Sequence, residues 1–457
     1  MSAPVHNQSV RFDPDLTASS HFDLPPASVD LTCAGVIDLG YGTPLECFGF
    51  GGNWPAASRG GGVSPDALPR QVIPYGRQSI SEADERAVLN VLKSDWLTQG
   101  PEVEAFEAGL AAYCGAAHAA AASSATSALH LACLAADLGP GDGLWTSPNT
   151  FVASANCGLY CGAAVGFVDI DPCSGNMDVV QLESRLRKAA VLGKLPKVVV
   201  SVHFAGQPCD MRSIRALSRE YGFMVVEDAS HALGAEYLGG KTGACLHSDM
   251  TVFSFHPVKI ATTGEGGAVL TSDPELHKKI VSFRSHGITR DPGAMIRPCP
   301  GPWYYEQHSL GFNYRMCDLQ AALGLSQLSR VDAFVARRRE LAARYDRLLA
   351  DLPVTPLRQG SDSKSAYHLY VVRIEPKPGS PTQARVLGQL RNAGIAATLH
   401  YLPVHTQPYY LGLGFQEGDF PEAERYSREA VTLPLYYDLN QDDQDRVIRE
   451  LARALGA

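Results

Sequence analysis

The sequence predicts an α/β protein with a mostly parallel central sheet, flanking helices and a smaller C-terminal α/β domain. Two observations carry this prediction. Short, continuously apolar runs recur from residue 73 onward, and such runs are typical of strands buried on both faces. Segments with apolar residues three and four positions apart alternate with these runs. That alternation of helical and strand-like patterns indicates βαβ units.

The helices of the large domain are predicted from apolar spacing and from the residues at their ends. The segment SATSALHLACLAADLG begins at Ser124 and is expected to end at Gly139, and DMRSIRALSREYG is expected to end at Gly222. Spacing alone predicts three further helices, at residues 82–94, 102–114 and 316–328.

The strands of the large domain are predicted from short apolar runs rich in valine. They lie at residues 163–170, 197–203 and 223–230, and on either side of Lys259 in TVFSFHPVKIATTGEGGAVLT. The GEGG of that last segment is interpreted as a turn between strands, in which the glycines adopt positive φ.

The chain of 457 residues is divided into three parts. Residues 1–72 are rich in Gly and Pro and lack sustained apolar periodicity, so we expect a disordered N-terminal extension. Residues 73–328 form the expected large domain and residues 329–457 the small one. The small domain is expected to contain a long helix at 329–350, strands at 366–374 and 395–403 around a helix at 384–394, and a last helix from near Asp442.

Composition excludes several classes of protein. The net charge of -9 and the absence of a basic stripe argue against a nucleic-acid partner, and RRRE at 337–340 is interpreted as the solvated face of a helix. The eleven cysteines have no zinc-binding spacing, so we expect no metal and a reducing compartment. No membrane-spanning run and no secretion signal is visible, so a cytoplasmic protein is expected.

Lys259 is the residue that first suggests a chemistry. It is a single cation between two strand-like apolar runs, followed by small and hydroxylated residues. An amine in apolar surroundings loses solvation of its charged form, so its pKa falls and it becomes nucleophilic. Lysines of this kind form Schiff bases with carbonyl compounds, including pyridoxal 5'-phosphate (PLP).

Three further features match what PLP requires. Asp228 closes an apolar run at the carboxyl end of a strand, where a carboxylate can pair with the pyridinium nitrogen, and Glu227 is expected on the other face. SSATSALH offers small residues at a helix start for the phosphate. Phe151 is a candidate for the aromatic group above the ring. A dinucleotide-binding GxGxxG loop is absent, which argues against hydride transfer.

The chain resembles the sugar-nucleotide aminotransferases of PLP fold type I, the DegT/StrS type, over residues 73–455. The segments that carry the resemblance are SDWLTQGPEVEAFE, SSATSALH, SPNTFVASAN, EDASHALGAEY, FSFHPVKIATTGEGGAVLT, SFRSHGI, LGFNYRMCDLQAALGLSQL and HYLPVHTQPYY. Within the family the pattern is most similar to the transaminases of pseudaminic acid biosynthesis. The resemblance implies the type I fold, PLP as cofactor and a homodimer whose active sites are shared between subunits.

The resemblance also implies residue roles. Lys259 would bind PLP and act as the catalytic residue, and Asp228 would pair with the ring nitrogen. His231 stands where many relatives carry Gln beside the ring oxygen. Further cofactor contacts would come from Ala125, Thr126, Phe151 and Ser254, and from Asn313 of the neighbouring subunit. The residues that would line the sugar-nucleotide site are Tyr75, Asp95, Trp96, Leu97, Thr98, His400, Tyr401, Leu402 and Pro403.

The reaction implied by the resemblance is transfer of the amino group of L-glutamate to C4 of a UDP-linked 4-keto-6-deoxy-N-acetylhexosamine. The residues leave the nucleotide carrier and the ring carbon open, so a dTDP-linked sugar and amination at C3 are alternatives. A sugar dehydratase is disfavoured because similar dehydratases carry His in place of Lys259. A regulator that only binds a sugar nucleotide is disfavoured because Lys259 and Asp228 are both present.

Overall fold

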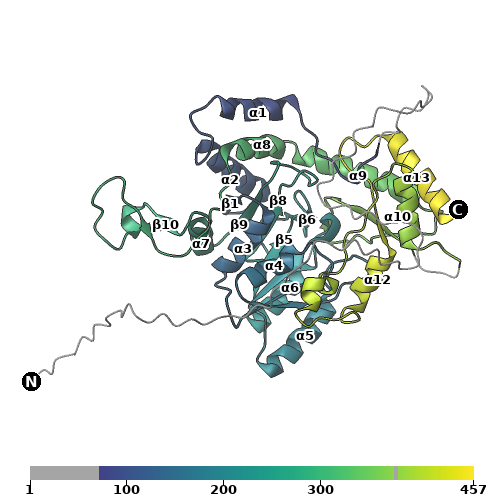
Figure 1. Ribbon diagram of the computed structural model, residues 1–457, viewed down its shortest axis with the longest axis horizontal. Helices are drawn as coiled ribbons and strands as arrows, with labels where there is room; N and C mark the ends of the chain where they lie inside the picture. The colour runs from purple at the N-terminus through teal and green to yellow at the C-terminus, as the bar shows by residue number, and fades with distance from the viewer. Residues whose placement is uncertain (1–71, 375–378) are drawn as a thin grey trace, which may run out of the picture. The chain divides into compact units, whose positions relative to one another are not determined.

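The computed structural model describes residues 72–374 and 379–457. The predicted disordered extension lies outside the described residues, except for Val72. Seven strands form the central sheet in the order β1-β9-β8-β5-β4-β2-β3, and helices cover both of its faces (Figure 1). The strands are β1 (His118–Ala122), β2 (Gly143–Thr146), β3 (Ala164–Phe167), β4 (Val198–Val202), β5 (Met224–Asp228), β8 (Met250–Ser254) and β9 (Gly267–Thr271).

The sheet is mostly parallel, as predicted. Strands β3, β2, β4, β5 and β8 run parallel to their neighbours, whereas β9 is antiparallel to both β8 and β1. All five residues of β4 are buried, and so are all five of β8 and β9. Continuous burial explains why these strands have no polar alternation in the sequence.

Consecutive residues of β5 enter different layers of the core. Val226 packs with α3 (Ala125–Ala135), α4 (Ala153–Tyr160) and α7 (Pro274–Arg284) on one face of the sheet. Val225 packs on the other face with α5 (Val179–Leu192) and α6 (Met211–Tyr221). The same alternation therefore separates Glu227 from Asp228 at the end of the strand.

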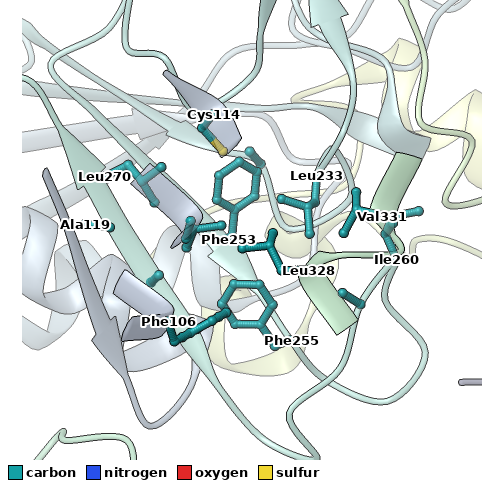
Figure 2. Close-up of a cluster of buried hydrophobic side chains, with 14 of the residues drawn as sticks. Phe106, Cys114, Ala119, Leu233, Phe253, Phe255, Ile260, Leu270, Leu328 and Val331 are labelled. Carbon is teal, nitrogen blue, oxygen red and sulfur yellow. The ribbon is translucent and has the colours of Figure 1, made fainter. Parts of the chain in front are cut away.

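A third apolar cluster joins the sheet to the helices around the lysine loop. Figure 2 shows Phe106 of α2 (Pro101–Cys114) against Phe255, with the two rings 5.2 Å apart, and Leu328 at the end of α8 (Asp318–Leu328) beside them. Ile260, next to Lys259 in the chain, belongs to the same cluster. The loop that carries the lysine is thus held by packing on one side.

Two helix ends test the sequence predictions. α6 stops at Gly222, which has a φ of 78°, as predicted. α3 ends earlier than expected, at Ala135, because Asp137 takes the left-handed conformation with a φ of 53° before Gly139 is reached. Asp is among the few non-glycine residues that tolerate this conformation.

The C-terminal part contains a three-stranded antiparallel sheet of β12 (Thr355–Pro356), β14 (Tyr370–Arg373) and β15 (Ala430–Leu433). The strand predicted at 395–403 is wrong. Its backbone pairs only at isolated positions, Ile395 with Ile73 and Thr398 with Thr432, so β15 takes the third place in the sheet. The helices here are α9 (Val331–Leu348), α10 (Gln383–Asn392), α12 (Pro421–Glu429) and α13 (Gln441–Leu455).

Arg338 corrects the interpretation of RRRE as a solvated face. Its side chain points from α9 into the protein and is only 2% exposed. The guanidinium donates from Nη1 to the backbone oxygens of Leu435 at 2.8 Å, His368 at 3.2 Å and Tyr367 at 3.3 Å. Burial lowers the pKa of Arg338 to about 10. The charged group therefore ties α9 to the segment that leads into β14.

The remaining elements are short, apart from α1. They are α1 (Glu82–Leu92), β6 (Glu236–Tyr237), β7 (Gly240–Lys241), β10 (Ile288–Thr289), β11 (Glu306–Gln307), β13 (Ser363–Lys364) and α11 (Pro408–Leu411). Within the described ranges, no helix has the length and apolar character needed to cross a bilayer. These ranges belong to one compact unit, so the domain division at residue 328 stays a prediction.

Candidate active site

Lys259 lies in the loop between β8 and β9. Its backbone N–H donates to the oxygen of His256 at 2.9 Å, which makes the loop a tight turn, and its side chain is half-buried. Burial lowers the pKa of the Lys259 ammonium to about 8, against the opposing effect of the Asp228 carboxylate. The charged form still predominates at pH 7, but the amine is uncharged far more often than that of an ordinary lysine and can act as a nucleophile.

Asp228 ends β5 and is 5% exposed. One carboxylate oxygen accepts a hydrogen bond from the Ser154 hydroxyl at 2.6 Å, and the other accepts from the Ser230 backbone N–H at 3.1 Å. Ser154 is itself 2.7 Å from the hydroxyl of Thr150. The carboxylate is therefore held in one orientation by α4 and by the turn that follows β5.

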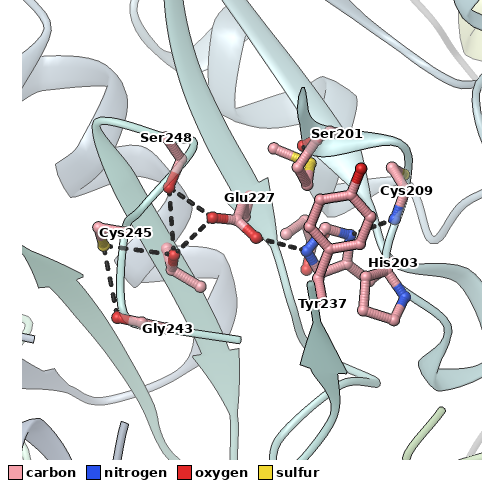
Figure 3. Close-up of polar contacts among 12 residues, drawn as sticks. Ser201, His203, Cys209, Glu227, Tyr237, Gly243, Cys245 and Ser248 are labelled. Atoms are coloured by element: carbon pink, nitrogen blue, oxygen red, sulfur yellow. Dashed lines mark hydrogen bonds and ion pairs between the residues drawn. The ribbon is translucent and has the colours of Figure 1, made fainter. Parts of the chain in front are cut away.

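Glu227 faces the opposite side of the sheet, as predicted. Figure 3 shows it between His203 and Ser248, with Oε2 2.6 Å from His203 Nε2. Thr251 donates a further hydrogen bond to Oε1 at 3.2 Å. The backbone N–H of His203 donates to the backbone oxygen of Asp228 at 3.0 Å. Glu227 thus anchors the back of the strand whose front carries Asp228.

The predicted anion site is assembled where α3 begins. Ala125 and Thr126 are its first two residues, and the Ser124 hydroxyl is occupied in capping Ser127. Gly267 of β9 approaches so closely that a Cβ there would lie 2.5 Å from the Ala125 nitrogen. Ser254 is the partner of Gly267 across β8 and β9. Helix N–H groups and a hydroxyl are brought together, and this donor set fits a phosphate.

This close approach corrects the interpretation of GEGG. Gly264 has a φ of 79° and serves the turn as predicted. Gly267 does not have a positive φ. Glycine is required at this position because any side chain would collide with the start of α3.

A group of histidines surrounds the lysine. His231 is 5% exposed, its Nε2 lies 3.1 Å from the Tyr401 hydroxyl, and its ring is 4.4 Å from that of His368. His400 is also buried, and the ring of Tyr75 lies 5.2 Å from it. Burial lowers the pKa of His400 to about 3, with the Lys259 charge adding to the effect.

The other predicted residues have no side-chain hydrogen bond to these histidines among the described residues, and Phe151 is linked to Asp228 only through its backbone oxygen, which accepts from the Ser154 N–H at 3.2 Å. Phe151 has a side chain 57% exposed, and Leu402 is 60% exposed. The segment 95–98 is exposed throughout and pairs through Thr98 with Cys317, and Asn313 is exposed and pairs with Ser285. Pro403 is buried. The exposed segment 95–98 thus lies beside Cys317, four residues after Asn313.

Sequence reasoning missed three residues that contact the site. Ser154 lies in the segment SPNTFVASAN, four residues after Thr150, but Thr150 precedes α4, so helical spacing gave no signal for their contact. His368 had no signal, because a histidine in an apolar strand is ordinarily a packed residue. Asn149 accepts from the Tyr401 backbone N–H at 3.2 Å and also had no signal.

Comparison with known proteins gives consistent results. The profile of the DegT/DnrJ/EryC1/StrS aminotransferase family matches residues 78–452. SpsC, the spore coat polysaccharide biosynthesis protein of Bacillus subtilis, is 41% identical over 381 residues, which cover 82% of this chain and 95% of SpsC.

Solved structures with the same fold include PseC of Helicobacter pylori, an aminotransferase involved in the biosynthesis of pseudoaminic acid. It has a TM-score of 0.77 and 33% identity, covering 84% of this chain and 100% of PseC. The PLP form of Spr1654 from Streptococcus pneumoniae has a TM-score of 0.75 and 29% identity, covering 84% and 99%.

Gly267→Ala tests the anion site. The added methyl group must displace the start of α3, so we expect the affinity for PLP to fall at least about 10-fold, with overpacking costing about 1–3 kcal/mol of stability. Equilibrium titration with PLP measures the first effect and thermal unfolding the second. Gly139→Ala is the matched control, because nothing lies within 4 Å of a Cβ there. Equal affinities in the two variants would contradict this placement of the phosphate.

Proposed function

The chain belongs to the DegT/DnrJ/EryC1/StrS aminotransferase family, and from this premise we propose that it transfers the amino group of L-glutamate to C4 of a UDP-linked 4-keto-6-deoxy-N-acetylhexosamine. PLP is the cofactor of the family, and the fold is PLP fold type I. The observation that carries the proposal is a half-buried Lys259, whose pKa is lowered to about 8, within electrostatic range of the buried carboxylate of Asp228.

The choice of sugar rests on similarity. PseC, whose reaction belongs to pseudoaminic acid biosynthesis, matches 84% of this chain at 33% identity. SpsC is named for spore coat polysaccharide biosynthesis. The first name supports a sugar of the pseudoaminic acid type, and the second supports a product destined for a polysaccharide. We place the enzyme in the cytoplasm, as the sequence predicts.

The residues of this chain would act as follows. PLP, when bound, supplies a carbonyl that bonds to amines and a ring that accepts an electron pair from the adjacent carbon. Lys259 would bind the cofactor through Nζ and, when the substrate amine displaces it, hold and return a proton at Nζ. Asp228 would keep the ring nitrogen protonated by its negative charge, and Ser154 would keep that carboxylate oriented through the 2.6 Å hydrogen bond.

The direct test is an assay of products. The purified protein, loaded with PLP, is incubated with L-glutamate and a panel of UDP- and dTDP-linked keto sugars, and the amino sugars are identified by NMR. We expect 2-oxoglutarate and a 4-amino sugar from the UDP-linked 4-keto-6-deoxy-N-acetylhexosamine. A product from dTDP-linked sugars alone, or an amine at C3, would overturn the proposed substrate and leave the transaminase assignment intact.

Asp228→Asn removes the negative charge and keeps the shape of the side chain. We expect single-turnover amine transfer to slow by about 10²–10⁴-fold, because the ring nitrogen loses its proton and the ring accepts electrons poorly. Stopped-flow absorbance measures this rate.

Asp142→Asn is the control, since Asp142 pairs with Lys197 at the other end of the parallel strands. Glu227 is a poor control, because it is a buried acceptor of several hydrogen bonds. A rate in Asp228→Asn equal to that of the control would show that another carboxylate faces the ring.

We further propose a homodimer in which Asn313 completes the site of the neighbouring subunit. Asn313 is exposed in its own chain, and Leu310, three residues before it, is 81% exposed. Apolar exposure of this kind is typical of an interface.

Mixing two inactive variants tests the shared site. Lys259→Ala and Asn313→Asp should each be inactive alone, whereas random exchange of subunits should restore about a quarter of the native activity, since half of the dimers then carry one native site. The measurement is activity after exchange, with hybrid dimers verified by native mass spectrometry. Hybrids without activity would rule out a contribution of Asn313 across subunits.

A further inference from the structure

His231 carries one nitrogen without a protein partner. Its Nδ1 is buried and makes no hydrogen bond within the described residues, while Nε2 lies 3.1 Å from the Tyr401 hydroxyl. The whole residue is only 5% exposed, so solvent does not supply the missing partner in bulk. An unpaired polar atom in such a position needs a partner that the described residues do not supply, such as an ordered water or a bound ligand.

The proton of His231 can be assigned by counting hydrogen bonds. If Tyr401 donates to Nε2, then Nδ1 carries the proton and one group, Nδ1–H, remains unpaired. If Nε2–H donates to Tyr401, then both the Tyr401 hydroxyl proton and the lone pair on Nδ1 remain unpaired, since the hydroxyl has no other partner among the described residues. Each unpaired buried group costs about 1–3 kcal/mol, so the first arrangement is preferred.

The charges around His231 keep this arrangement fixed over a wide pH range. Burial lowers the pKa of His231 well below its usual value, and the nearby Lys259 and His400 lower it further. Burial also raises the pKa of the Tyr401 hydroxyl, so it stays protonated and able to donate. The imidazole is therefore neutral, with a single proton whose position Tyr401 decides.

His368 holds the plane of the ring. It packs at 4.4 Å from His231, and its own pKa is lowered by burial, by His231, by Lys259 and by Arg338. Arg338 also donates a hydrogen bond to the backbone oxygen of His368 at 3.2 Å, which holds this residue in place. Phe204 lies on another side, 6.2 Å from the His231 ring. The ring has little freedom to turn and exchange its two nitrogens.

We propose that Tyr401 is a positioning residue that holds His231 in the tautomer protonated at Nδ1, so that His231 donates a hydrogen bond to the ring oxygen of PLP. The sequence comparison alone places Tyr401 among residues for the sugar; the geometry assigns it to the cofactor instead. The inference rests on the proposed cofactor site around Lys259. A donor to this oxygen stabilises its negative charge and so weakens its hold on the proton that it shares with the Lys259 nitrogen.

The test is a pH titration of the cofactor's absorption in the PLP-loaded protein. In Tyr401→Phe the hydroxyl is lost, His231 is free to adopt the other tautomer, and we expect the midpoint of the absorption change to rise by about one pH unit. Tyr426→Phe is the matched control. Tyr426 is buried, its ring lies 5.8 Å from Phe204, and its hydroxyl has no hydrogen bond to lose.

A double variant separates control of the tautomer from general packing. In His231→Asn the side-chain amide can donate from the position of Nδ1 whatever Tyr401 does, so adding Tyr401→Phe should leave the midpoint unchanged. An unmoved midpoint in Tyr401→Phe, an equal rise in Tyr426→Phe, or a full rise in the His231→Asn background would each overturn the inference. A native protein in which borohydride fixes no PLP to Lys259 would instead overturn the proposed function.

Discussion

The alternation of side chains along β5 is the constraint on which the candidate site depends. Glu227 and Asp228 are consecutive carboxylates, and the pleat sends them to opposite faces of a sheet that is covered on both sides. The rear carboxylate makes hydrogen bonds to His203, Ser248 and Thr251, which fixes the strand in place. The Asp228 carboxylate then faces α4 in one orientation. A register shift of one residue would exchange the two and abolish the site.

The candidate phosphate site depends on a second close fit. The start of α3 and the start of β9 approach within a distance that only glycine at 267 permits. The start of α3 is thereby kept next to Gly267, whose partner in the sheet is Ser254. Packing, hydrogen bonding and backbone conformation all restrict the same few residues, which is why the site can be rigid although its members come from distant segments.

Much of this arrangement could be predicted from the sequence because it follows local rules. Apolar runs located β4, β5, β8 and β9, and the strand period placed Asp228 opposite to Glu227. The errors concern long-range packing. The segment 395–403 has the composition of a strand, but its partners are single residues of two different segments. Arg338 has the same sequence character as its partly buried neighbours Arg337 and Arg339, and only the three carbonyl oxygens that accept from it explain its full burial. The link of Tyr401 to His231 joins residues that no local pattern connects.

The pairing of β1 with β9 also determines when the site can exist during synthesis. His118 pairs with Thr271 and Ala122 with Gly267, so β1, the strand before α3, pairs with β9 only after the lysine loop has been made. Contacts of such long sequence separation form late, since the intervening chain must first be ordered. The candidate phosphate site is therefore not assembled in a nascent chain until both of these strands have left the ribosome. PLP would then bind only to chains in which β1 and β9 have already paired.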